Sequence, residues 1–284
     1  MRLRAFAKIN LGLHVVGTRP DGYHDIETVF HQIDLSDELE MVQNDEGDVF
    51  TSDSSELAGD KSNLCIRAVH VLRDLTGVHT GVEINLKKRI PIAAGLGGGS
   101  ADAAAVLKGL KKLWTLDVTD DELETVSATL GSDVPFFMRG GTAYATGRGE
   151  KLQPLEVSIP YWILVITPPV HISTTWAYTN LRINPGLQRA SLPDLLRTEI
   201  GQPELLREKL FNEFEPLVFA AHPEVRQIKE KLLNAGAHVA LMSGSGSTIF
   251  GFFSEQSPAE RIAREFSPGY HTSITEPKFR PQPN

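Results

Sequence analysis

The chain has a single cysteine, Cys65, among its 284 residues. One cysteine cannot form an internal disulfide, and no activating base stands beside it, so a buried and unreactive thiol is expected. This cysteine usage favours a reducing compartment, the cytoplasm. The chain also lacks any run approaching the ~20 apolar residues that a transmembrane helix needs. A membrane-spanning protein is therefore not expected.

The chain also has no excess of basic residues. Lysine and arginine number 28 against 36 aspartates and glutamates, a formal net charge of -8. This charge argues against broad binding to nucleic acid or to anionic membranes, which requires basic surface. Any phosphate site must therefore be local. The hydrophobic content of 41% is typical of a globular protein, and the length predicts about two domains.

Alternating residues near the N-terminus predict a strand. Apolar residues occupy the odd positions from Ala5 to Val15, a period of two that is typical of a half-buried strand. Lys8 and Asn10 would then lie side by side on its other face. The apolar run YWILVI at 161–166 predicts a buried strand that opens a second domain, so we place the domains at 1–156 and 157–284. Helices are expected over 191–199, 203–220 and 223–235.

The stretch PIAAGLGGGSADAA, which begins at Pro91, has four glycines within five positions. It lies between a predicted strand over 82–86 and a predicted amphipathic helix. A Walker loop would need a lysine after Gly99, where the chain has Ser100. A dinucleotide fingerprint counted from Gly95 would need a glycine at Ser100, and the HRD and DFG motifs of protein kinases do not occur.

Glycines let backbone N–H groups approach an anion, and a following helix directs its unpaired amides and positive dipole end to the same place. Ser100 could cap this helix and offer its hydroxyl to a phosphate. These features favour a phosphate cradle, although a tight strand-to-helix turn would also use glycines.

Three segments resemble the GHMP kinases, a family named for galactokinase, homoserine kinase, mevalonate kinase and phosphomevalonate kinase. They are PIAAGLGGGSADAA, the C-terminal MSGSGSTIFGFF and the N-terminal AKINLGLHVVGTRPDGYHDIETVF. The resemblance runs from Ala5 through Phe253 and includes GSDVPFF and NEFEPLV in the expected order. It implies an α+β fold of two domains: an ATP-binding domain with a left-handed βαβ crossover, then a ferredoxin-like domain.

The resemblance also implies site residues. Asp133 would be the general base and Lys8 the cation that holds it, although an aspartate at this position could simply cap the next helix. Asn10 would bond substrate or phosphate oxygens, and Asn63 is a weaker candidate near adenine. ATP would lie on the glycine stretch, formed by Pro91, Ile92, Ala93, Ala94, Gly95, Leu96, Gly97, Gly98, Gly99, Ser100 and Ala101.

The DGYH segment beside AKINL resembles family members that phosphorylate the 2-hydroxyl of a cytidine diphosphate-linked methylerythritol in the non-mevalonate isoprenoid pathway. His24 would read the cytosine edge, and Arg148 would contact the diphosphate. Tyr23, Phe30 and Tyr178 are candidates to stack on the base, with Phe30 and Tyr178 equally able to be core or rim aromatics.

ATP is then the expected co-substrate, carried with Mg²⁺ whose ligands the sequence does not indicate, and the expected assembly is a monomer or weak homodimer. Other functions stay open at this point: a GHMP kinase for homoserine, mevalonate or a sugar, or a nucleotide-binding regulator without catalysis. The presence of both Lys8 and Asp133 weighs against the regulator.

Overall fold

The computed structural model describes residues 1–57, 59–60 and 62–282, and within these ranges the chain forms two β-sheets with ten helices. The strands are β1 (Arg2–Thr18), β2 (His24–Asn44), β3 (Val49–Ser52), β4 (Gly81–Lys87), β5 (Thr142–Gly147), β6 (Lys151–Pro154), β7 (Trp162–Thr167), β8 (Val239–Met242), β9 (Ile249–Phe253) and β10 (His271–Thr275). The helices are α1 (Leu64–Thr76), α2 (Gly98–Leu113), α3 (Asp120–Ser127), α4 (Val134–Arg139), α5 (Thr174–Asn180), α6 (Leu192–Thr198), α7 (Pro203–Lys209), α8 (Glu215–Ala221), α9 (Pro223–Asn234) and α10 (Gln256–Phe266).

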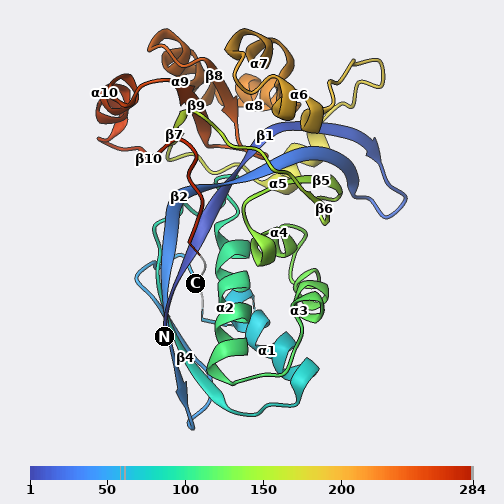
Figure 1. Ribbon diagram of the computed structural model, residues 1–284, viewed down its shortest axis with the longest axis vertical. Coiled ribbons are helices and arrows are strands. Elements are labelled where there is room, and N and C mark those ends of the chain that lie inside the picture. Colours follow the sequence, from blue (N-terminus) through green and yellow to red (C-terminus); the bar gives the residue numbers. More distant parts are fainter. Residues whose placement is uncertain (58, 61, 283–284) are drawn as a thin grey trace.

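The first sheet has the strand order β3-β4-β2-β5-β6, with β1 paired to β2. Helices α1 to α4 pack together beside its long strands (Figure 1) and bury one continuous apolar core against them. Strands β3 and β4 are parallel and joined through α1, which is the βαβ unit that the resemblance implies. The predicted strand over 82–86 and the helix after the glycine stretch are confirmed.

Strand β1 is buried on both faces, so the predicted half-buried strand is wrong in this respect. Leu3 and Ala5 pack into the core under the helices, whereas Ala7 and Ile9 pack into a second core toward the other sheet. The register of β1 against β2 shifts between Phe6 and Lys8. This irregularity turns the odd-numbered side chains from one core to the other, which simple alternation cannot predict.

The second sheet is antiparallel, with the order β10-β7-β9-β8. Along the chain, helices α5 to α9 lie between β7 and β8, and α10 lies between β9 and β10. This arrangement matches the expected ferredoxin-like domain. The proposed boundary at 156/157 falls between β6, the last strand of the first sheet along the chain, and β7, the first strand of the second sheet. Residues of both sheets share one apolar core.

The helix predicted over 203–220 is wrong: the structure has two, α7 and α8. Between them the chain runs beside β1, where Leu13 donates its N–H to Phe211 and accepts one from Glu213. These long-range bonds take the place of helical ones and leave no local pattern in the sequence. Within the described ranges, no helix is long and apolar enough to cross a membrane.

Candidate active site

A cavity of about 1000 Å³ lies where β1, the glycine stretch, α4, α5 and the β8–β9 loop meet. Every site residue predicted from the sequence lines it, except Leu96 and Ala101. Both of these are almost completely buried, so they support the loop rather than face a ligand. Residues separated by more than 200 positions in the chain thus share one cavity.

The glycine stretch forms the floor of the cavity and leads into α2. Gly95 and Gly97 both have positive φ, and a Cβ on Gly95 would lie 2.1 Å from the carbonyl oxygen of Ser243. Only glycine fits this position, because the backbone is left-handed and no room exists for a side chain. The prediction that Ser100 caps α2 is wrong: Gly97 is the N-cap, and Ser100 lies within the first turn.

The first turn of α2 leaves the N–H groups of residues 98–100 without helical partners, because α2 makes its first bond from Ala101 to Gly97. Gly98, Gly99 and Ser100 line the cavity. The helix dipole adds positive potential at the same place. The floor of the cavity therefore has the properties of an anion site.

A second glycine-rich loop, between β8 and β9, braces the first. Ser243 Oγ donates to the carbonyl of Gly95 at 2.9 Å, and Thr248 N–H donates to the carbonyl of Ala94 at 3.3 Å. The Asn10 N–H donates to Ser243 Oγ at 3.3 Å. Ser243 thus joins the glycine stretch to β1. The sequence resemblance includes this segment but implies no role for Ser243.

The NEFEPLV segment holds the second loop in turn. Asn212 Nδ2 donates to the carbonyls of Met242 at 2.8 Å and Gly244 at 2.7 Å. Glu215 Oε1 accepts the N–H of Met242, while its Oε2 pairs with Lys229 at 2.6 Å. No side-chain role was assigned to Asn212 or Glu215 from the sequence, because the loop that they hold lies about 30 residues away.

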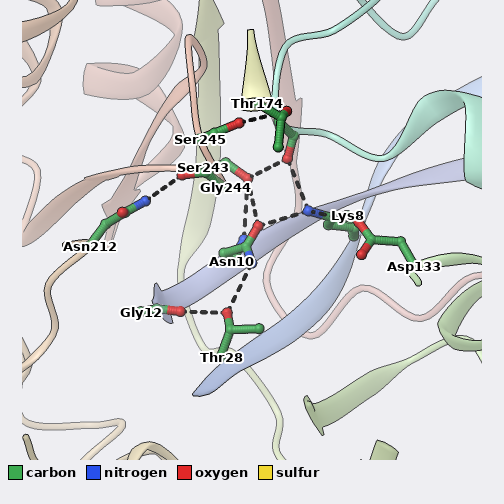
Figure 2. A network of polar contacts seen from close by, with 11 residues as sticks. Lys8, Asn10, Gly12, Thr28, Asp133, Thr174, Asn212, Ser243, Gly244 and Ser245 are labelled. Carbon is green, nitrogen blue, oxygen red and sulfur yellow. Dashed lines mark hydrogen bonds and ion pairs between the residues drawn. The ribbon is translucent and has the colours of Figure 1, made fainter. Parts of the chain in front are cut away.

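Lys8 lies at the centre of the polar contacts that Figure 2 shows. Its Nζ donates to Asn10 Oδ1 at 2.8 Å and to the Gly95 carbonyl at 3.2 Å, and it lies 3.5 Å from Asp133 Oδ2. The predicted proximity of Lys8 and Asn10 on one face of the strand is confirmed. The ammonium group therefore joins the glycine stretch to Asp133.

Asp133 is the N-cap residue of α4, yet its side chain makes no capping hydrogen bond. The alternative that this aspartate serves as a helix cap is therefore wrong. Its side chain is 31% exposed, against 5% for Lys8, and it lines the cavity. A carboxylate that faces a cavity beside a lysine can accept a proton from a bound hydroxyl.

Burial lowers the pKa of Lys8, while the charge of Asp133 and the hydrogen bond to it raise the pKa. A phosphoryl group in the cavity would raise the pKa of Lys8, as Asp133 does, because a second negative charge favours the ammonium form. The site is thus arranged so that ligand charge strengthens the cation.

Asn10 is held by the protein itself. Its Oδ1 accepts from Lys8, and its Nδ2 donates to Thr28 Oγ1 at 2.9 Å, which in turn donates to the Gly12 carbonyl. The predicted contact of Asn10 with substrate or phosphate oxygens stays a prediction. What these bonds establish is that Asn10 fixes the position of the Lys8 ammonium.

Polar and aromatic side chains form the other end of the cavity. The rings of His24 and Tyr178 lie 5.0 Å apart, and the Arg148 guanidinium lies 4.9 Å from the Tyr23 ring centre. Tyr23 is 55% exposed, so one face can accept another ring. Burial and the nearby Asp133 raise the pKa of Tyr178, which keeps its hydroxyl protonated.

Phe30 is 1% exposed and packs against Phe136 with 5.1 Å between ring centres. Lys8 Nζ lies 4.9 Å from its ring centre. A base needs a free ring face to stack on, so Phe30 fits the core alternative. Asn63 lines the cavity and also caps α1, its Oδ1 accepting the Cys65 N–H at 2.8 Å.

Comparison with known proteins shows which family has this arrangement. The pattern for the GHMP kinases N terminal domain matches residues 63–141, and that for the GHMP kinases C terminal matches 191–271. A 4-diphosphocytidyl-2-C-methyl-D-erythritol kinase of Chlorobium phaeobacteroides (strain BS1) is 46% identical over 99% of this chain and 98% of its own length. The chain belongs to the GHMP kinase family.

Further relatives agree with this assignment. An Enterococcus faecalis (strain ATCC 700802 / V583) protein of the same name is 42% identical over 91% of this chain and 92% of its own length. A crystal structure of 4-(cytidine 5'-diphospho)-2C-methyl-D-erythritol kinase matches this kinase with a TM-score of 0.82 and 33% identity, covering 99% of this chain and all of the other. A homoserine kinase structure from Cytophaga hutchinsonii, at 20% identity over 96% of this chain and 95% of its own and a TM-score of 0.72, shares the fold. The protein is an ATP-dependent small-molecule kinase with the expected two-domain α+β fold.

Proposed function

We propose that this kinase transfers the γ-phosphoryl group of ATP to the 2-hydroxyl of 4-diphosphocytidyl-2-C-methyl-D-erythritol, in the non-mevalonate pathway. One observation carries the proposal: a single cavity brings together the glycine stretch, the Lys8–Asp133 pair and the cluster of Tyr23, His24 and Arg148. The curated relatives that match nearly the whole chain bear the name of this activity.

Each end of the cavity has a distinct part in the proposed reaction. The amides of residues 98–100 bind the phosphates of ATP, and Asp133 accepts the proton of the attacking hydroxyl. The oxygen of that hydroxyl forms a bond to the γ-phosphorus, and the bond from this phosphorus to the β–γ bridging oxygen breaks, releasing ADP. Lys8 orients Asp133 and offsets the negative charge on the transferring group.

The aromatic end binds the cytidine diphosphate portion. Tyr178 packs on His24 and so fixes the imidazole for a contact with the cytosine edge. Tyr23 offers an exposed ring face for stacking, and Arg148 lies where it can bond a diphosphate oxygen. This end supplies binding and orientation, which align the hydroxyl with ATP.

Mg²⁺ is expected to enter with the nucleotide. No group of three or more His, Cys, Asp or Glu side chains in the described part of the chain is arranged to hold a metal ion. Mg²⁺ in nucleotide sites is commonly bound through phosphate oxygens and water. Bound with ATP, the ion would neutralise phosphate charge.

A coupled assay for ADP release tests the proposal. We expect turnover with the cytidylyl substrate and none above background with homoserine, mevalonate or galactose at equal concentration. His24→Ala should raise the KM for the cytidylyl substrate while the KM for ATP changes less than about twofold. ADP release that ignores the cytidylyl substrate, or responds better to another acceptor, contradicts the proposal.

A further inference from the structure

A second lysine with acidic partners lies at the nucleotide end of the cavity. Lys88 Nζ donates to Asp102 Oδ2 at 2.8 Å and also pairs with Asp37 Oδ2. The three side chains come from the residue that follows β4, from α2 and from β2, and all are buried. Lys88 and Asp102 also line the cavity.

The two carboxyl groups differ in their partners. Asp37 Oδ1 accepts the backbone N–H groups of Arg89 at 2.5 Å and of Ile90 at 2.8 Å, so both of its oxygens are engaged. Asp102 Oδ1 is buried and has no hydrogen-bond partner among the residues that the structure describes. Several N–H donors favour an ionised carboxylate, whereas a buried oxygen without a donor disfavours one.

The net charge of the three side chains also indicates that Asp37 is ionised and Asp102 is protonated. One ammonium and two carboxylates would leave an uncompensated negative charge in the interior, which is strongly unfavourable. One proton on Asp102 removes it. Burial, opposed by the charge of Lys88 and reinforced by that of Asp37, raises the pKa of Asp102 to about 8.

Two further titratable groups face this site. Cys65, on α1, has its pKa raised by burial, so its thiol stays uncharged. His271, on β10, faces Asp37 and has its pKa lowered by burial, so its imidazole is neutral at and above neutral pH. Neither group supplies a charge that could replace the proton on Asp102.

The buried group lies directly against the glycine stretch. A Cβ on Gly98, the first residue of α2, would lie 2.9 Å from Lys88 Nζ. Asp102 is one turn further along the same helix. We propose that Asp37, Lys88 and Asp102 form a positioning element that holds one proton on Asp102, and that losing this proton weakens nucleotide binding at α2. The inference rests on the proposed placement of the ATP phosphates against this helix.

The direction of the effect follows from the charges. With Asp102 neutral, the group has no net charge, and with Asp102 ionised it carries one negative charge beside the phosphates. Raising the pH through about 8 should therefore weaken ATP binding. Asp102→Asn keeps the shape of a neutral carboxyl group but cannot ionise, so its affinity should stay constant over this range.

Calorimetric titration of the full chain with MgATP, without an acceptor substrate, tests the inference at pH 7.5 and pH 9. We expect the Kd of the unchanged protein to rise about three- to eightfold between these values, and that of Asp102→Asn to change less than twofold. Asp37→Asn removes the ionised partner and leaves the group without a net negative charge whether or not Asp102 ionises, so its Kd should also change less than twofold between these values. Asp120→Asn, whose side chain is exposed and pairs with Lys111, is the matched control and should follow the unchanged protein.

The outcomes separate this inference from the proposed function. An equal rise in Kd for the unchanged protein and Asp102→Asn overturns the inference, as does an Asp37→Asn chain whose Kd still rises with pH as much as that of the unchanged protein. An Asp102→Asn chain that fails to fold also counts against it, because an amide should replace a neutral carboxyl group. No ATP binding by the unchanged protein would instead contradict the proposed function.

Discussion

Two lysines border the same cavity, and they are paired in opposite ways. Lys8 faces one carboxylate, Asp133, which is partly exposed and 3.5 Å away. Lys88 faces two carboxyl groups, Asp37 and Asp102, whose side chains are 0% and 3% exposed. Burial lowers the pKa of Lys8, whereas the two carboxyl partners outweigh burial at Lys88 and raise its pKa.

This difference shows what distinguishes a reacting pair from a supporting one. Asp133 has no capping bond and an open side, so a substrate hydroxyl can reach it. Asp37 has donors on both oxygens, and its side chain is fully buried. We therefore expect substitutions at the open pair to affect catalysis, and substitutions around the loops to affect nucleotide affinity.

The largest effect is expected for Asp133→Asn. The amide keeps the size of the side chain but cannot accept the hydroxyl proton, so kcat should fall about 10²- to 10⁴-fold. The Kd for ATP should stay within about twofold, measured by calorimetry. Unchanged kcat would remove Asp133 from the role of general base.

Lys8→Met should lower kcat by about 10²- to 10³-fold, because the transferring group loses a buried cation. Steady-state assays at saturating substrates measure this loss. Lys111→Met is the matched control: Lys111 pairs with the exposed Asp120 outside the cavity, and its kcat should not change. Similar losses in both variants would contradict the comparison.

Gly95→Ala should weaken ATP binding by at least about tenfold. Alanine in this left-handed backbone conformation carries strain of about 1–3 kcal/mol, which is relieved only if the loop shifts. The new Cβ would lie 2.1 Å from the Ser243 oxygen. At Gly131, which has a Cβ contact no closer than 3.6 Å, alanine should leave the affinity unchanged. Equal affinities for the two variants would show that the loop adapts freely.

Ser243→Ala should have the smallest effect, a rise of about three- to tenfold in the KM for ATP. One hydroxyl that bridges two loops is lost, and such a bond contributes about 1 kcal/mol. Ser254→Ala, which removes a hydroxyl bonded to His238 at the surface, should leave KM unchanged. A fall in kcat alone would indicate that Ser243 acts on chemistry instead.

The sequence predicted the parts of the site that lie close together in the chain. Alternation brought Lys8 beside Asn10, and clustered glycines between a strand and a helix indicated the phosphate site. The supporting contacts could not be predicted, since Ser243 reaches Gly95 across about 150 residues and the two glycine-rich loops meet only in three dimensions. The Asp37–Lys88–Asp102 group left no pattern for the same reason.

The sequence also did not indicate which aromatic side chains lie in the core and which face the cavity. Phe30 and Tyr178 were equal candidates for the substrate side, yet Phe30 packs in the core and Tyr178 lies on His24. The bulge between Phe6 and Lys8 reorients β1 and buries both of its faces. Such irregularities arise from tertiary packing, which residue periodicity does not record.

Competitive amine labelling of the unchanged protein over a range of pH, read by mass spectrometry, tests the contrast between the two lysines most directly. We predict that Lys8 becomes reactive at lower pH than an ordinary lysine and is protected by ATP together with the cytidylyl substrate. Lys88 should stay unmodified until higher pH, with or without these ligands. A more reactive Lys88, or a Lys8 that the ligands do not protect, would contradict the account.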